Sequence, residues 1–276
     1  MAQEVLSFKT PDGLELKAHA WTSEVDSRGI VVLVHGLGEH LMRYAHVAKV
    51  FNDNGLHVYA FDQRGHGRSE GPRGHTPSGD QLMADMKQAI QQAKTKLGAD
   101  LPVFLYGHSL GALEVLYFGS TQQETLKGII ATSPPLDLSS TPKSKLTLAK
   151  LMNPLLPKLT MPNGLDTNAL SHDTAVVEAY KTDPLVHDQI SVRLGYFMIS
   201  GAEKVMAAAS VWHYPLLLMH GSEDRICGIK GTEELVSRLK GDVTYKRWEG
   251  LYHETHNEPQ KAEVIQTMVD WINARL

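Results

Sequence analysis

The sequence predicts an α/β protein in which helices cover both faces of a mostly parallel sheet. Two observations carry this prediction. Short apolar runs, several of them rich in β-branched or aromatic residues, alternate with stretches in which apolar residues recur at helical spacing. The chain also has 276 residues, of which 42% are hydrophobic and 21% charged, so it can bury one large core without cross-links.

The first predicted element is an antiparallel hairpin at the start of the chain. Residues 5–8 and 14–18 are short strand candidates, and the turn tripeptide Pro11-Asp12-Gly13 lies between them.

The later elements alternate between strand and helix. Apolar runs typical of strands buried on both faces occupy residues 30–34, 57–61, 102–106, 128–132 and 215–219, and a last strand is predicted at residues 243–248. Helical spacing is found at residues 41–54, 80–97, 110–122, 231–239 and 259–276. With the hairpin this gives an eight-stranded sheet, and ligands bind such sheets at the carboxyl ends of the strands.

The segment of residues 135–210 interrupts this alternation, because it is several times longer than one crossover between strands requires. We therefore divide the chain into a first core part at residues 1–134, an inserted cap at residues 135–210, and a second core part at residues 211–276.

Within the insertion, a set of apolar residues repeats at helical spacing between lysines, and prolines interrupt the helix; the apolar set is Leu148, Leu151, Met152, Leu155, Leu156 and Leu159. One interpretation is that this face packs on the domain below. Another is that it lines an acyl pocket or touches lipid. The two interpretations are compatible.

A nucleophile is indicated by Gly107-His108-Ser109-Leu110-Gly111, which follows a predicted strand and precedes a predicted helix. A G-x-S-x-G motif indicates a nucleophilic serine only between a strand and a helix, because the sharp turn there exposes the serine at the helix N-terminus. Ser109 is therefore the candidate nucleophile.

A serine hydroxyl needs a base to take its proton, and the candidate base is His253. It lies in the loop that leaves the carboxyl end of the last predicted strand, which places it near Ser109. His256 is the second choice. The run from His253 to His256 is one residue short of the H-E-x-x-H zinc motif, so we expect no metal site there.

The acid that orients the base is expected at a strand end between the serine and the histidine. Asp224 follows the apolar run at residues 215–219 and fits this place best. Glu223 is the alternative, although an extended loop would point it elsewhere. Backbone amides of Leu110 and Leu37 are the candidate oxyanion donors, the latter in a loop opened by Gly36 and Gly38.

Other features exclude several classes of function. The net charge is −4 without a basic stripe, which argues against nucleic-acid binding, and the single cysteine, Cys227, forms no internal disulfide. Leu41 stands where a dinucleotide loop needs its third glycine, so no cofactor is expected. Without a signal peptide or an apolar run of about 18 residues, the sequence predicts a cytoplasmic protein.

Four motifs together resemble the monoacylglycerol lipase group of α/β-hydrolases, also described as lysophospholipase-like or serine-aminopeptidase-like. They are His35 to His40 with Arg43-Tyr44, Asp62-Gln63-Arg64-Gly65-His66-Gly67-Arg68-Ser69, Gly107 to Gly111, and His220 to Asp224 with His253. The resemblance implies the α/β-hydrolase fold, a cap inserted between the sixth and seventh strands, and the triad and oxyanion pair named above. It also implies monoacylglycerols or similar small lipid esters as substrates.

We therefore expect a serine hydrolase that cleaves carboxylic esters through an acyl-enzyme intermediate. The alternatives are a lysophospholipase, a general carboxylesterase, or a catalytically silent fold that binds a small ligand. Ser109 excludes dehalogenases and epoxide hydrolases, which need an aspartate there, whereas peptidase and carbon–carbon hydrolase chemistry fit the same triad.

Overall fold

An eight-stranded sheet forms the centre of the protein. The computed structural model describes residues 2–138 and 143–276, so residues 139–142 of the predicted cap lie outside the described residues. In sheet order the strands are β1 (Ala2–Lys9), β2 (Glu15–Thr22), β4 (Leu56–Phe61), β3 (Gly29–Val34), β5 (Val103–His108), β6 (Gly128–Thr132), β9 (Leu216–Gly221) and β10 (Val243–Trp248). β2 runs opposite to the other seven strands, which confirms the predicted hairpin and the mostly parallel sheet.

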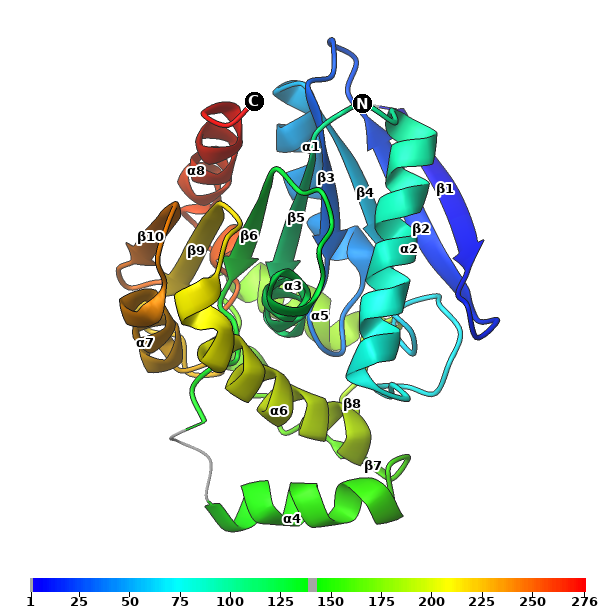
Figure 1. Cartoon of the computed structure of the whole chain (residues 1–276), viewed down its shortest axis with the longest axis vertical. Coiled ribbons are helices and arrows are strands. Elements are labelled where there is room, and N and C mark those ends of the chain that lie inside the picture. Colours follow the sequence, from blue (N-terminus) through cyan, green and yellow to red (C-terminus); the bar gives the residue numbers. More distant parts are fainter. Residues whose placement is uncertain (1, 139–142) are drawn as a thin grey trace.

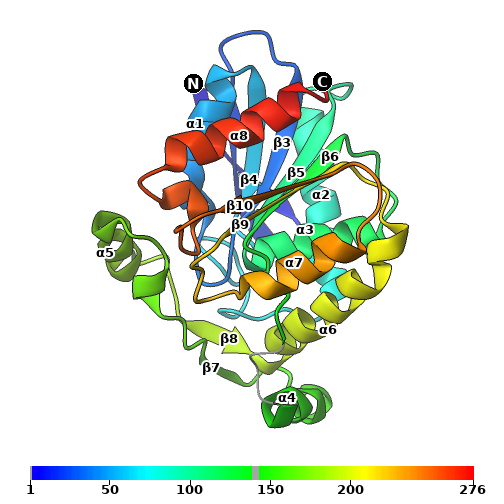
Figure 2. The same ribbon diagram turned by 90° about the vertical axis from the view of Figure 1, so that its left-hand side faces the viewer.

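Helices cover both faces of this sheet (Figure 2). One face carries α1 (Ala45–Asp53), which follows the short helix η1 (Leu41–Tyr44), and α8 (Lys261–Asn273). The other carries α2 (Gly79–Leu97), α3 (Leu110–Thr121) and α7 (Ile229–Arg238). Strands such as β3, buried at every position, have the continuous apolar sequence that two covered faces require.

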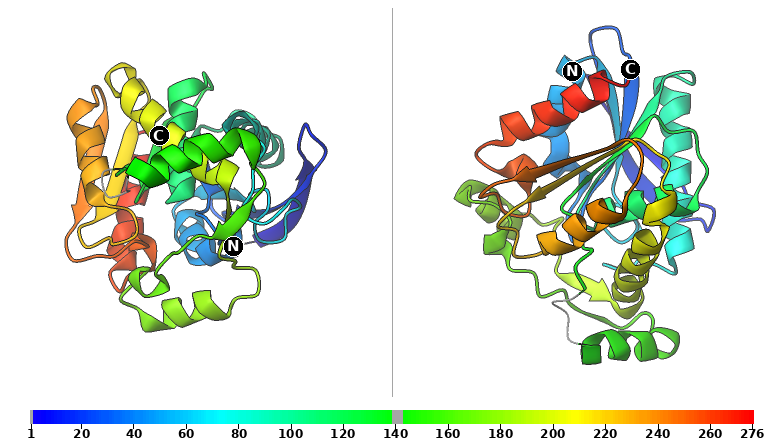
Figure 3. Two further views of the ribbon diagram at one scale, coloured as in Figure 1. Left: turned by 90° about the horizontal axis from the view of Figure 1, so that it is seen from below. Right: turned by 60° about the vertical axis from the view of Figure 1, so that its left-hand side comes forward.

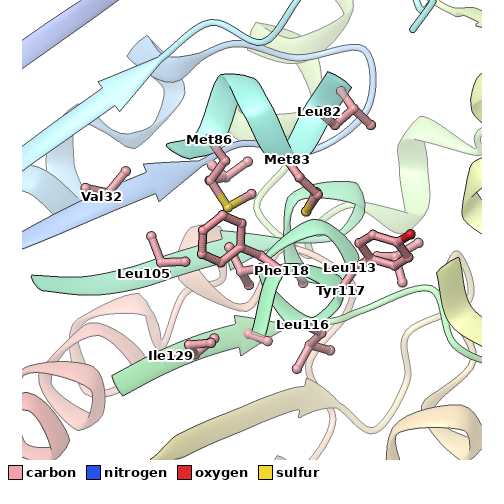
Figure 4. Packing of buried hydrophobic residues seen from close by; sticks show 14 of the residues in the cluster. Val32, Leu82, Met83, Met86, Leu105, Leu113, Leu116, Tyr117, Phe118 and Ile129 are labelled. Carbon is pink, nitrogen blue, oxygen red and sulfur yellow. The ribbon is translucent and has the colours of Figure 1, made fainter. Parts of the chain in front are cut away.

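Helix α3 is the most deeply buried helix of the core, with ten of its residues buried. Figure 4 shows Leu113, Leu116 and Phe118 of α3 packed among α2 and the strands. This packing holds the N-terminus of α3, and with it Ser109, in a fixed place at the sheet.

The segment between β6 and β9 lies beyond the carboxyl ends of the parallel strands, at the bottom of Figure 1 and nearest the viewer in the left view of Figure 3. Its elements are α4 (Lys143–Leu155), β7 (Thr160–Pro162), η2 (Thr167–Ala169), α5 (Thr174–Thr182), β8 (Gln189–Ser191), α6 (Val192–Ala208) and η3 (Ala209–Val211). These elements lie in the chain between the sixth and seventh strands of the sheet, and their division from the core as a cap stays a prediction.

The apolar face of this insertion is largely exposed. Large fractions of Leu148, Leu151 and Leu155 are accessible, at 54%, 64% and 78%, and Leu156 and Leu159 are exposed too. Packing on the domain below therefore does not account for these leucines, because α4 meets the rest of the protein mainly through α6.

Candidate active site

Ser109 occupies a strained turn between β5 and α3. Its φ is 54°, in a region that non-glycine residues rarely adopt, and its amide donates a hydrogen bond of 2.9 Å to the carbonyl of Thr132. A Cβ atom on Gly107 would lie 2.2 Å from the carbonyl oxygen of Gly111, so the turn can close only with glycine there. The strand–turn–helix setting predicted for Ser109 is confirmed.

Asp224 and His253 form a buried hydrogen-bonded pair. Nδ1 of His253 donates to Oδ2 of Asp224 at 2.7 Å, while the amides of Ile226 and Cys227 donate to Oδ1 at 2.8 and 2.9 Å. The Nε2 atom of His220 also lies 3.1 Å from Oδ2. The carboxylate is therefore fixed on both oxygens, and Nε2 of His253 is left as the nitrogen that can accept a proton.

The electrostatics of this pair favour its charged forms. Burial acts to raise the pKa of Asp224, but His253 and the hydrogen bonds from His220 and His253 lower it below its ordinary value. For His253, burial acts to lower the pKa, and the Asp224 carboxylate outweighs that effect, so the pKa is raised above 6.5. The site is thus built to stabilise an imidazolium that forms next to an ionised carboxylate.

The structure brings this pair to the same edge of the sheet as Ser109. The ring of His253 lies 4.8 Å from the ring of His108, the residue before Ser109, and the Ser133 hydroxyl donates to the carbonyl of His253 at 2.8 Å. Cys227, whose amide is bound by Asp224, lines the same cavity as Ser109. The three residues singled out in the sequence therefore lie together.

The two candidate oxyanion donors both lie close to Ser109. Leu110 is the first residue of α3, directly after Ser109. The loop that contains Leu37 runs alongside, since a Cβ on Gly36 would lie 3.3 Å from Cβ of Ser109, and Leu37 lines the cavity with Ser109. Their donor role stays a prediction.

The two alternative residues lie outside this arrangement. His256 is fully buried, stacks on Tyr44 with ring centroids 4.8 Å apart, and has no hydrogen-bond partner for either ring nitrogen within residues 2–138 and 143–276. Glu223 is exposed, whereas its neighbour Asp224 points to His253.

A cavity of about 540 Å³ opens beside Ser109. Its core wall includes Leu37 and Cys227, and its outer wall comes from the insertion, with the apolar side chains of Ile190, Met198 and Ile199. Leu148, Leu151 and Leu155 of α4 are not among the described residues that line this cavity, and whether that helix borders an acyl pocket stays a prediction.

Sequence reasoning missed a buried ion-pair network at the same edge. Arg43 lies between Glu39 and Glu254 and contacts both carboxylates. Arg43 and Glu39 belong to a motif that the sequence analysis singled out, but their partner Glu254 lies 211 positions away, and no local pattern links them.

No helix within the described parts of the chain is long and apolar enough to cross a membrane.

Several known proteins are similar to this chain. The monoacylglycerol lipase of Mycolicibacterium smegmatis is 34% identical over 279 residues, which cover 98% of this chain and 97% of that protein. The crystal structure of a monoacylglycerol lipase from Paleococcus ferrophilus is 35% identical, with a TM-score of 0.85 and complete coverage of both chains. An uncharacterized abhydrolase domain-containing protein of Dictyostelium discoideum is 37% identical, and this chain spans 30% of its length.

The family model described as "Serine aminopeptidase, S33" matches residues 25–260, which include Ser109, Asp224 and His253. The resemblance predicted from the four sequence motifs is confirmed by these relatives. The chain belongs to the serine aminopeptidase S33 family and has the α/β-hydrolase fold.

Proposed function

We propose that this protein is a serine carboxylic ester hydrolase that cleaves monoacylglycerols. The observation that carries the proposal is the buried 2.7 Å hydrogen bond between His253 and Asp224, formed at the sheet edge where Ser109 stands in its strained turn. A nucleophile that lines a cavity, a base and an orienting acid at one edge are the parts that acyl transfer requires.

In the proposed mechanism Nε2 of His253 takes the proton of the Ser109 hydroxyl as Oγ attacks the ester carbonyl. The carbonyl oxygen becomes an oxyanion, which accepts hydrogen bonds from the amides of Leu37 and Leu110. When the intermediate collapses, His253 returns the proton to the departing glycerol oxygen and the acyl group stays on Ser109. A water molecule, activated by the same histidine, then hydrolyses the acyl-enzyme. No step needs a cofactor or a metal ion.

The substrate class is supported by the relatives and by the cavity. Two of the relatives are monoacylglycerol lipases that match over nearly their whole length. The cavity has a size typical of small-ligand sites, and its wall combines apolar residues of α6 and β8 with the polar Asn163 and Asp166. That combination suits an ester with an acyl chain and a hydroxylated head.

We propose that residues 135–210 act as a cap over this cavity and that the cap touches lipid surfaces transiently. The support is the exposed row Leu148, Leu151 and Leu155 on α4, with lysines such as Lys150 close by. An amphipathic helix with exposed leucines and lysines has the chemistry of an interfacial helix. A cytoplasmic location and the lack of a nucleic-acid partner remain predictions of the sequence.

A substrate panel tests the proposed function. We expect faster hydrolysis of monoacylglycerols than of lysophospholipid, p-nitrophenyl esters of matched chain length or an aminoacyl amide. A fluorophosphonate should label wild type but not Ser109→Ala. The Ser109→Ala variant should lose ester hydrolysis by a factor on the order of 10⁴ or more and keep its melting temperature, because only one hydroxyl is removed. Absent labelling of wild type would favour the silent ligand-binding alternative, and a preference for lysophospholipid would favour a lysophospholipase.

A further inference from the structure

One buried arginine lies between two loops of the candidate active site. Nη1 of Arg43 donates to Oε2 of Glu39 at 2.6 Å and to Oε1 of Glu254 at 2.6 Å, and Nη2 donates to Oε2 of Glu254 at 2.7 Å. The three side chains are 10%, 3% and 2% exposed, so little solvent screens these contacts.

Glu39 connects Arg43 to the oxyanion loop. Its Oε1 atom accepts a hydrogen bond of 2.7 Å from the amide of Gly36 and another of 2.7 Å from the Tyr44 hydroxyl. Gly36 immediately precedes Leu37, the proposed oxyanion donor. The direction of the Glu39 carboxylate therefore fixes the backbone from which that donor projects.

Glu254 connects Arg43 to the loop of the proposed base. Glu254 directly follows His253, its amide donates to the carbonyl of Leu170 at 2.8 Å, and its Oε2 accepts from the Asn257 side chain at 2.8 Å. With the bidentate contact from Arg43, both carboxylate oxygens are engaged. A change at Arg43 therefore reaches the backbone beside His253.

The arginine also reaches the insertion, because its guanidinium lies 4.8 Å from the ring centre of Tyr180 on α5. One cation thus contacts Glu39 beside the oxyanion loop, Glu254 in the histidine loop and Tyr180 in the proposed cap, and it lies between two buried carboxylates.

We propose that Arg43 is a positioning residue that holds the oxyanion loop at residues 35–38 and the His253 loop in their reactive relative placement, so that it governs turnover more than substrate binding. This inference rests on the proposed function of Ser109 and His253. Displacing a donor or a base by about 1 Å can cost on the order of 10²-fold in rate, so a small shift of either loop has a measurable effect.

A second buried arginine provides the matched control. The Arg64 side chain is 2% exposed, and its guanidinium contacts Asp85 at 2.6 Å and Asp12 at 3.1 Å, on α2 and on the turn of the first hairpin. Lysine keeps the charge in either place but loses the planar bidentate geometry. Arg43→Lys and Arg64→Lys therefore remove comparable buried contacts, one beside the site and one outside it.

The test measures kcat, KM and melting temperature for wild type, both lysine variants and Ser109→Ala, with a monoacylglycerol and with p-nitrophenyl butyrate. We expect both lysine variants to melt at lower temperature. Arg43→Lys should lose roughly 10- to 100-fold in kcat with KM changed by less than about threefold, whereas Arg64→Lys should keep the wild-type kcat. Equal kcat in the two lysine variants would overturn the inference.

A second variant covers the case in which Arg43→Lys does not fold. The charged and titratable groups around His253 are Asp224, Glu254 and Glu39, which raise its pKa, and the imidazoles of His108 and His256, while Arg43 binds Glu254 and Glu39. Glu254→Gln keeps the shape but removes one negative charge, so the acid limb of kcat/KM should move to lower pH and kcat should fall. An unmoved acid limb with unchanged kcat would contradict the proposal.

Failure of this inference differs from failure of the proposed function. If Ser109→Ala retains activity, the nucleophile itself is misassigned. If Ser109→Ala is inactive but Arg43→Lys turns over like wild type, only the positioning role is wrong.

Discussion

His253 and His256 are separated by only two residues, yet one ring is hydrogen-bonded to a carboxylate and the other is packed among aromatic rings. His253 donates through Nδ1 to Asp224 at 2.7 Å, whereas His256 stacks on Tyr44 and meets His108 edge to face at 75°, with centroids 4.7 Å apart. Burial lowers the pKa of His256 well below its ordinary value, so it stays neutral inside the core. These surroundings support the proposal that His253 transfers protons, whereas His256 packs in the core.

This contrast predicts separate effects of two alanine variants. His253→Ala should lose activity by a factor on the order of 10⁴ or more with little loss of stability. His256→Ala should keep most of kcat and lose about 1 to 3 kcal/mol of stability, because it leaves a cavity beside Tyr44. Steady-state kinetics and thermal melts of both variants provide the measurement. Reversed effects on activity would make His256 the base.

The pH dependence of the rate follows from the electrostatics of the Asp224–His253 pair. Only neutral imidazole can accept the serine proton, and the pKa of His253 is raised in the folded protein. The rate kcat/KM should therefore rise with pH through a midpoint above the ordinary histidine value of about 6.5.

Asp224→Asn provides the control for this midpoint. The amide removes the negative charge that raises the pKa and no longer fixes the needed tautomer, so activity should fall on the order of 10⁴-fold. The residual acid limb should move to lower pH. Near-normal activity in Asp224→Asn would transfer the acid role to Glu223.

Local patterns in the sequence predicted the strands and helices around the central sheet and the edge at which the candidate site lies, but they did not predict β7, α5, β8 or α6 of the insertion. Continuous apolar runs reveal strands with two covered faces, and the glycines around Ser109 mark a turn that other residues would block. Parallel strands then bring their carboxyl ends to one edge, which is why Ser109 and His253 could be placed together.

Contacts between distant residues could not be predicted in this way. Nothing near Arg43 in the sequence points to Glu254, because an ion pair depends on which loops the fold places side by side. The row at Leu148, Leu151 and Leu155 has the periodicity of a helix face, but periodicity does not say what covers that face, and here solvent does.

Glu114 is a further buried group that the sequence did not reveal, and it predicts a pH-dependent stability. It lies on α3 among apolar neighbours, 2% exposed, and its Oε1 atom has no hydrogen-bond partner in the described chain. Burial, reinforced by the charge of Asp85, raises its pKa well above 4.5.

A carboxyl whose pKa is raised by folding destabilises the protein between its unfolded and folded pKa values. In that range the unfolded chain releases the proton and the folded chain keeps it, so the free energy of unfolding falls by about 1.4 kcal/mol per pH unit. Glu114→Gln should remove this slope, raising the melting temperature at pH 8 more than at pH 5. Glu263→Gln, exposed in the first turn of α8, is the control and should change the melting temperature equally at the two pH values. Equal effects of Glu114→Gln at both pH values would mean that Glu114 is ionised in the folded protein.

The last prediction concerns Cys227, whose thiol lies inside the site. Its side chain is 7% exposed and lines the cavity with Ser109, and its amide donates to Asp224 at 2.9 Å. Burial, with the nearby Asp224 charge, raises the pKa of the thiol well above 9, so little thiolate is present at neutral pH. N-ethylmaleimide should therefore react slowly at pH 7 and faster at alkaline pH.

Once formed, an adduct at Cys227 should block the cavity in proportion to its size. We expect the maleimide adduct to lower hydrolysis strongly and the smaller methylthio adduct to lower it less, while Cys227→Ala stays active and is insensitive to both reagents. Residual rate plotted against adducts counted by intact mass provides the measurement. Full labelling with unchanged turnover would contradict the placement of the thiol in the substrate cavity, because an adduct there must compete with the acyl chain for the space beside Ser109.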